Sequence, residues 1–182
     1  MKWNIPNVLT TFRMALIPVF LVVFYLPFEG SHFWSAFIFW LAAITDALDG
    51  YIARRFNQFT KFGAFLDPVA DKAMVVVAFV IVVEDYNSAW VSIPALTMIC
   101  REIIVSALRE WMARIGKETQ VKVSNLGKLK TVAQMLALIG LLWQANTFIE
   151  SLSFGLLYLA FVLTIWSMYE YIKAAWADLS EN

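Results

Sequence analysis

The chain has 182 residues, of which 61% are hydrophobic and 15% are charged, and its formal net charge is zero. Soluble domains are roughly one half apolar and about one quarter charged, so this composition excludes an ordinary water-soluble fold. A net charge of zero identifies no partner by itself, and we expect no nucleic-acid partner.

Apolar stretches of about 20 residues recur along the sequence, and each is long enough to cross a hydrocarbon layer of about 30 Å. In chain order they predict six membrane spans, at about 9–27, 33–54, 64–83, 90–113, 127–145 and 152–173. The connections between them are short. We therefore expect an all-α polytopic membrane protein whose residues 1–182 form a single membrane-embedded domain.

The positions of the basic residues predict how these spans are oriented. Lys and Arg occur near both termini and in the second and fourth connections, whereas the first, third and fifth connections contain none. Cytoplasmic loops of membrane proteins carry an excess of Lys and Arg. Both termini and the even-numbered connections are therefore expected to face the cytoplasm.

Four aspartates stand at the facing ends of the second and third predicted spans. Asp46 and Asp49 share one face of span two, and Asp67 and Asp71 are four residues apart on span three. Because the connection between the spans is short, the two helices are expected to be antiparallel neighbours, and all four carboxylates can meet. Ionised carboxylates in a membrane normally face an interior or a wet cavity and mark function.

Four negative charges at one place repel one another unless cations neutralise them. Oxygen-only ligands favour hard divalent ions, so the sequence predicts a site for two ions of Mg²⁺ or Mn²⁺. Such a pair can hold a pyrophosphate during displacement at phosphorus. Gly50 and Gly63 allow a phosphate to approach the backbone, and the planar fork of Arg54 suits a phosphate contact.

These residues resemble the signature of the CDP-alcohol phosphotransferase family, D-x2-D-G-x2-A-R-x8-G-x3-D-x3-D. Every specified position is filled, by Asp46, Asp49, Gly50, Ala53, Arg54, Gly63, Asp67 and Asp71. The resemblance implies a six-helix membrane fold that is usually homodimeric. It also implies transfer of a phosphoalcohol from a CDP-linked donor, with release of CMP.

The same resemblance implies roles for individual residues. Asp46, Asp49 and Asp67 are expected to bind metal, and Asp71 is expected to be both a metal ligand and the general base that takes the acceptor's proton. The residues expected around the cytidine diphosphate are Asp46, Gly50, Arg54, Thr60 and Gly63.

The likeness covers essentially the whole chain and is greatest to bacterial members of the family. The segments that carry it are NIPNVLTTFR, FGAFLDPVADK, REIIVSALREW and GKLKT. It implies CDP-diacylglycerol as the donor and the bacterial cytoplasmic (inner) membrane as the location, with membrane lipids as neighbours and the active site facing the cytoplasm.

Basic residues on the cytoplasmic side predict the class of acceptor. Arg101 lies well inside the fourth span, where a guanidinium needs an anion or a water-filled cavity. A cationic pocket suits a phosphorylated acceptor, and we expect glycerol 3-phosphate. The residues expected to bind its phosphate are Asn7, Thr10, Arg13, Arg101, Arg109, Lys128 and Lys130. Two weaker explanations stay open: Arg101 pairs only with Glu102 or an aspartate, and Lys128 and Lys130 only contact lipid headgroups.

Three other functions fit parts of the pattern. The same chemistry could use serine or inositol phosphate as the acceptor. Buried carboxylates also occur in ion pathways, but a transporter needs polar groups on both sides of the membrane midplane, and here the charges gather on one side. A noncatalytic scaffold that binds anionic lipid would not depend on Asp71.

Overall fold

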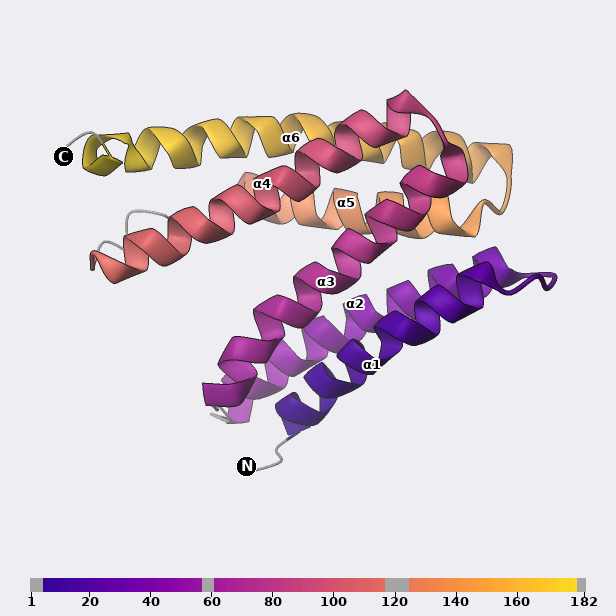
Figure 1. Cartoon of the computed structure of the whole chain (residues 1–182), viewed down its shortest axis with the longest axis horizontal. Helices are drawn as coiled ribbons and strands as arrows, with labels where there is room; N and C mark the ends of the chain where they lie inside the picture. Colours follow the sequence, from indigo (N-terminus) through magenta and orange to yellow (C-terminus); the bar gives the residue numbers. More distant parts are fainter. Residues whose placement is uncertain (1–4, 57–60, 117–124, 180–182) are drawn as a thin grey trace.

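The computed structural model describes residues 5–56, 61–116 and 125–179, and these residues form six α-helices joined by short connections (Figure 1). In chain order the helices are α1 (Ile5–Tyr25), α2 (Ser31–Phe56), α3 (Lys61–Tyr86), α4 (Ala89–Arg114), α5 (Asn125–Trp143) and α6 (Thr147–Leu179). The prediction of an all-helical fold is confirmed.

Each predicted span corresponds to one helix, but most of the helices extend beyond the apolar stretch. The sixth span was expected at 152–173, whereas α6 covers Thr147–Leu179. Hydropathy marks only the part of a helix that is apolar, and the backbone hydrogen bonds continue into its polar ends.

Within the described residues, three helices are long and apolar enough to cross a membrane, namely α1, α4 and α6. The apolar part of α5, Leu129–Trp143, is shorter. The helices α2 and α3 are continuous, and each carries two of the four aspartates within its apolar stretch. The helices are those of a membrane-embedded protein, and the full six-span topology with cytoplasmic termini stays a prediction.

The core is formed by side chains from all six helices. Helix α1 packs on α2 and α3, α5 packs on α6 and α2, and α4 packs on α6. Large side chains that are almost fully buried include Phe20, Phe39, Phe79, Met98, Leu138 and Leu157. Many other large apolar residues are exposed, which suits a surface that faces lipid rather than water.

Helix ends that carry the predicted site lie at the same end of the molecule. On the left of Figure 1 are the N-terminal ends of α1, α3 and α5 and the C-terminal ends of α2, α4 and α6. The alternation follows from the short connections, which make consecutive helices run in opposite directions. Residues near the start of α1, the end of α2 and the start of α3 are therefore brought together.

Candidate active site

One face of α1 is polar and almost completely buried. Asn7, Thr10 and Arg13 are spaced three residues apart, and their exposed fractions are 4%, 0% and 1%. The hydroxyl of Thr10 donates a hydrogen bond to Asp67 Oδ1 on α3. This face therefore contacts the helices that carry the aspartates.

The guanidinium of Arg13 joins α1 to both aspartates of α2. Its Nη1 lies 2.5 Å from Asp46 Oδ1, and its Nη2 forms an ion pair with Asp49 Oδ2. The Asp49 side chain is 5% exposed and that of Asp46 is 42% exposed. A planar guanidinium that spans two carboxylates supplies positive charge where two negative charges meet.

Asp71 lies one turn beyond Asp67 on α3 and completes what we call the carboxylate region, formed by Asp46, Asp49, Asp67 and Asp71. Its carboxylate is within electrostatic range of Asp46 and Arg13, and also of Lys72 and Glu102. Asp71 thus stands between the other aspartates and the residues of α4.

The carboxylate region suits hard divalent ions, because the groups it offers as ligands are carboxylate oxygens. Two of its aspartates already pair with a positive charge, the guanidinium of Arg13. Nevertheless, no three Asp, Glu, His or Cys side chains among the described residues are grouped as a ready metal site. The assignment of metal ligands stays a prediction.

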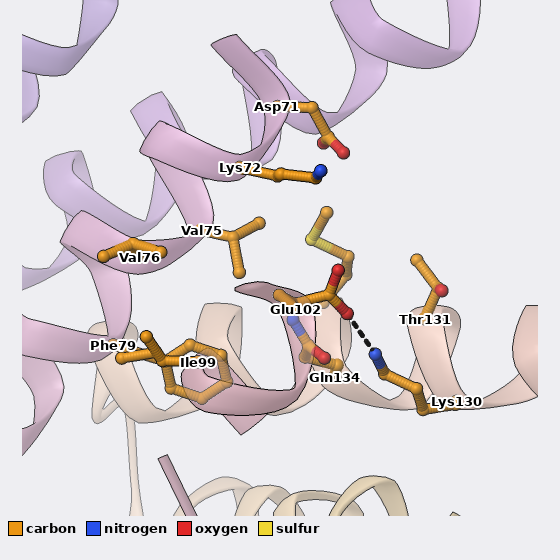
Figure 2. A pocket seen from close by; sticks show the side chains of 11 residues that line it. Asp71, Lys72, Val75, Val76, Phe79, Ile99, Glu102, Lys130, Thr131 and Gln134 are labelled. Carbon is orange, nitrogen blue, oxygen red and sulfur yellow. Dashed lines mark hydrogen bonds and ion pairs between the residues drawn. The ribbon is translucent and has the colours of Figure 1, made fainter. Parts of the chain in front are cut away.

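A cavity of ≈ 80 Å³ lies between α3, α4 and α5, directly beside Asp71 (Figure 2). Its polar wall contains Lys72 from α3, Glu102 from α4 and Lys130 from α5. Apolar side chains such as Val75 and Phe79 close its inner part. The cavity is polar where it meets the carboxylate region and apolar deeper in the bundle.

Three basic side chains, those of Arg101, Arg109 and Lys130, form what we call the cation region. Arg101 makes the most contacts of the three. Arg101 is 8% exposed, and its Nη1 donates to Glu102 Oε1 at 3.0 Å. Its Nη2 donates to Ser167 Oγ at 3.0 Å, and its guanidinium lies 5.4 Å from the centre of the Tyr171 ring.

Arg109 and Lys130 each bind a residue that also contacts Arg101. Arg109 Nη2 donates to the Tyr171 hydroxyl at 2.7 Å, and its guanidinium also lies 5.4 Å from the centre of that ring. Lys130 is 3% exposed and donates to Glu102 Oε1 at 2.5 Å. Helix α6 thus orients the arginines through Tyr171, and Glu102 joins α4 to α5.

Residues 3–166 match the CDP-alcohol phosphatidyltransferase family. The chain belongs to this family. The matched segment contains the whole carboxylate region and every member of the cation region.

Several curated relatives match the chain along its full length, and each is called a CDP-diacylglycerol–glycerol-3-phosphate 3-phosphatidyltransferase. The protein from Escherichia coli (strain K12) is 58% identical over 182 residues and covers 100% of both chains. The protein from Salmonella typhimurium is 59% identical over 182 residues, and the one from Yersinia pestis (strain Pestoides F) is 59% identical over 181, again with 100% of both chains covered.

The structure places the predicted acceptor-binding residues of this family member in two groups. Asn7, Thr10 and Arg13 lie beside the carboxylate region, whereas Arg101, Arg109 and Lys130 gather around Glu102 and Tyr171. Among the residues predicted near the cytidine diphosphate, Gly50 and Gly63 lie in α2 and α3. Thr60 and the side chains of Arg54 and Lys128 lie outside the described residues.

Sequence patterns missed the residues of α6 that contact the arginines. Ser167 and Tyr171 are four apart on a helix that also carries exposed aromatic residues, such as Trp166 and Tyr169, so nothing in the sequence distinguishes them from lipid contacts. Their burial, 1% and 9% exposed, appears only when α4 packs on α6. Lys72, which donates to Ser106 Oγ, was also given no role.

Proposed function

We propose that this protein transfers the phosphatidyl group of CDP-diacylglycerol to the primary hydroxyl of sn-glycerol 3-phosphate, giving phosphatidylglycerophosphate and CMP. One observation carries the proposal: the match at 58% identity over the full length to a protein with that named activity in Escherichia coli. The product is a precursor for phosphatidylglycerol and cardiolipin.

In the proposed reaction the primary hydroxyl oxygen of the acceptor attacks the β-phosphorus of the donor. A new phosphorus–oxygen bond forms, the bond from that phosphorus to the bridging oxygen breaks, and CMP leaves with the bridging oxygen. The hydroxyl proton passes to the carboxylate of Asp71. The position of Asp71 supports this role, since it lies between the other aspartates and the cavity.

Divalent ions are part of the proposal, and the residues that would hold them are Asp46, Asp49, Asp67 and Asp71. When bound, Mg²⁺ or Mn²⁺ would neutralise charge on the diphosphate and on the departing CMP. Arg13 keeps Asp46 and Asp49 oriented from α1. Thr10 does the same for Asp67 through its hydrogen bond.

The cation region is proposed to bind the phosphate of the acceptor. Arg101, Arg109 and Lys130 bring three positive charges together, against one carboxylate, Glu102. The planar forks of the arginines suit a phosphate. The cavity beside Asp71 then receives the carbon chain of the acceptor, with its reactive hydroxyl directed to the base.

The membrane arrangement is proposed from charge. Basic residues flank the carboxylate region and occur near both chain ends, so the active site and both termini are placed on the cytoplasmic face of the bacterial inner membrane, with all six helices as spans. Lipid then surrounds the exposed apolar side chains, and CDP-diacylglycerol reaches the site from within the bilayer. A homodimer is proposed from the family alone.

The test is an acceptor competition. Purified protein in vesicles containing CDP-diacylglycerol is offered glycerol 3-phosphate, serine and inositol phosphate together, and the lipid products are separated. We expect phosphatidylglycerophosphate as the main product, with one CMP released for each molecule formed. A preference for serine or inositol phosphate would refute the choice of acceptor, and no CMP release with any of them would refute the enzyme.

A further inference from the structure

Glu102 is a carboxylate in the wall of a cavity that is proposed to receive an anionic acceptor. Its side chain is 26% exposed and lines the cavity between α3, α4 and α5. A negative charge at this place repels the phosphate of the acceptor. Its presence in the cavity wall therefore calls for another explanation. The family signature does not include Glu102.

Both cations that pair with Glu102 use the same oxygen. Arg101 Nη1 and Lys130 Nζ both donate to Oε1, at 3.0 and 2.5 Å. Within the part of the chain that the structure describes, Oε2 receives no hydrogen bond. In Figure 2 this second oxygen lies on the side of the carboxylate that is nearer to Lys72 and Asp71.

A second acceptor in the same wall also lacks a donor. Gln134 lines the cavity and is 4% exposed, and its Oε1 is buried without a hydrogen-bond partner among the described residues. Since buried acceptors are nearly always satisfied, this wall suits a ligand that supplies O–H or N–H donors. The two neighbouring ammonium groups make their recorded hydrogen bonds to other acceptors, since Lys130 donates to Glu102 Oε1 and Lys72 donates to Ser106 Oγ.

The cavity is large enough for part of a three-carbon polyol. Its volume is ≈ 80 Å³, and one water requires at least roughly 10–15 Å³ on the same measure. Asp71 lies at one side of this space and Glu102 at another. Two neighbouring hydroxyls of one acceptor can therefore meet two different carboxylates.

We propose that Glu102 is a specificity-determining residue: its Oε2 accepts a hydrogen bond from the secondary hydroxyl of the acceptor, while the primary hydroxyl lies at Asp71. The inference rests on the proposed function, because it assumes a phosphorylated polyol as the acceptor. The ion pairs with Arg101 and Lys130 keep Glu102 ionised, so it accepts a hydrogen bond and donates none.

The test removes the hydroxyl from the substrate and the carboxylate from the protein. Values of kcat/KM are measured for glycerol 3-phosphate and for propane-1,3-diol monophosphate, which lacks the secondary hydroxyl. The unchanged protein should prefer glycerol 3-phosphate by about 10- to 100-fold, as expected for a hydrogen bond to a charged group. In Glu102→Ala this preference should fall to about twofold or less.

Both substrates are measured on one preparation, so a smaller folded fraction in the variant cancels from the ratio. Glu102→Gln is the second variant, because it keeps the size of the side chain, and its preference should be intermediate. Glu110→Gln is the matched control: Glu110 lies two turns further along α4, pairs with Arg114 at 2.6 Å, and should leave the ratio unchanged.

A preference that persists in both Glu102 variants would overturn the inference, as would an unchanged protein that uses the two acceptors equally well. In either case turnover of glycerol 3-phosphate would leave the proposed function standing. If the unchanged protein released no CMP with glycerol 3-phosphate, the proposed function itself would fall.

Discussion

The carboxylate region and the cation region are built in the same way with opposite charge. In the first, Arg13 from α1 binds two aspartates of α2. In the second, Glu102 of α4 binds Arg101 and Lys130. In each region the built-in counter-charge is smaller than the charge it faces, so one region retains attraction for cations and the other for anions. Under the proposed function, this difference would separate the metal ions and the diphosphate from the acceptor phosphate.

The strongest way to break this comparison is to remove the charge of Asp71, which stands between the two regions. We expect Asp71→Asn to lower kcat by about 10³-fold, because an amide cannot take the acceptor's proton. CMP release measures the effect. An unchanged elution profile in detergent is the control for folding, and turnover near that of the unchanged protein would show that Asp71 is not the base.

A smaller effect is expected from the cation region. Arg101→Ala should raise the KM for glycerol 3-phosphate by about 10- to 100-fold, because it removes a buried charge and leaves Glu102 with one partner fewer. The KM for CDP-diacylglycerol should change little. Steady-state kinetics with each substrate varied in turn measures both values. An increase confined to the KM for the lipid would assign Arg101 to the other region.

Tyr171 allows a finer test of the cation region, because it contacts Arg101 and Arg109 but carries no charge itself. Tyr171→Phe keeps the ring beside both arginines and loses the hydrogen bond to Arg109. It should raise the KM for glycerol 3-phosphate a few-fold, and Tyr171→Leu should raise it further, while kcat stays within about twofold. Tyr169→Phe is the matched control, since Tyr169 is 64% exposed on the same helix. Equal effects at both positions would contradict the role of Tyr171.

The smallest effect on activity is expected where packing alone changes. A Cβ at Gly140 would overlap the hydroxyl of Ser153 and lie 3.0 Å from its Cβ, so Gly140→Ala must displace that hydroxyl from its hydrogen bond to Ile149 O or move α5 away from α6. We expect a loss of about 1–3 kcal/mol in stability. Thermal unfolding in detergent measures it, with Gly155→Ala as the control, because a Cβ at Gly155 meets no atom within 4 Å. Equal stability of both variants would contradict the close α5–α6 packing.

The position of the four aspartates could be predicted because they lie on two consecutive helices with a short connection, whereas their role as metal ligands stays a prediction. Spacing alone then brings Asp46, Asp49, Asp67 and Asp71 to the same end of the bundle. It did not predict that Arg13 would bind Asp46 and Asp49, because that contact depends on how α1 packs against α2.

The cation region was predictable only in part. Arg101 was singled out because a charge deep in an apolar helix is unusual, and Arg109 and Lys130 because they lie on the same predicted side of the membrane. Their partners were not, since Ser167 is 66 residues from Arg101 and Tyr171 is 62 residues from Arg109. Such contacts are set by tertiary packing, and hydropathy carries no information about which face of α6 meets α4.

The most direct test of the account is metal-dependent CMP release in vesicles containing CDP-diacylglycerol. With glycerol 3-phosphate present, we predict release with Mg²⁺ or Mn²⁺, its loss when the ions are chelated, and its return when they are restored. Release that continues unchanged after chelation would contradict the claim that the four aspartates act through bound divalent ions.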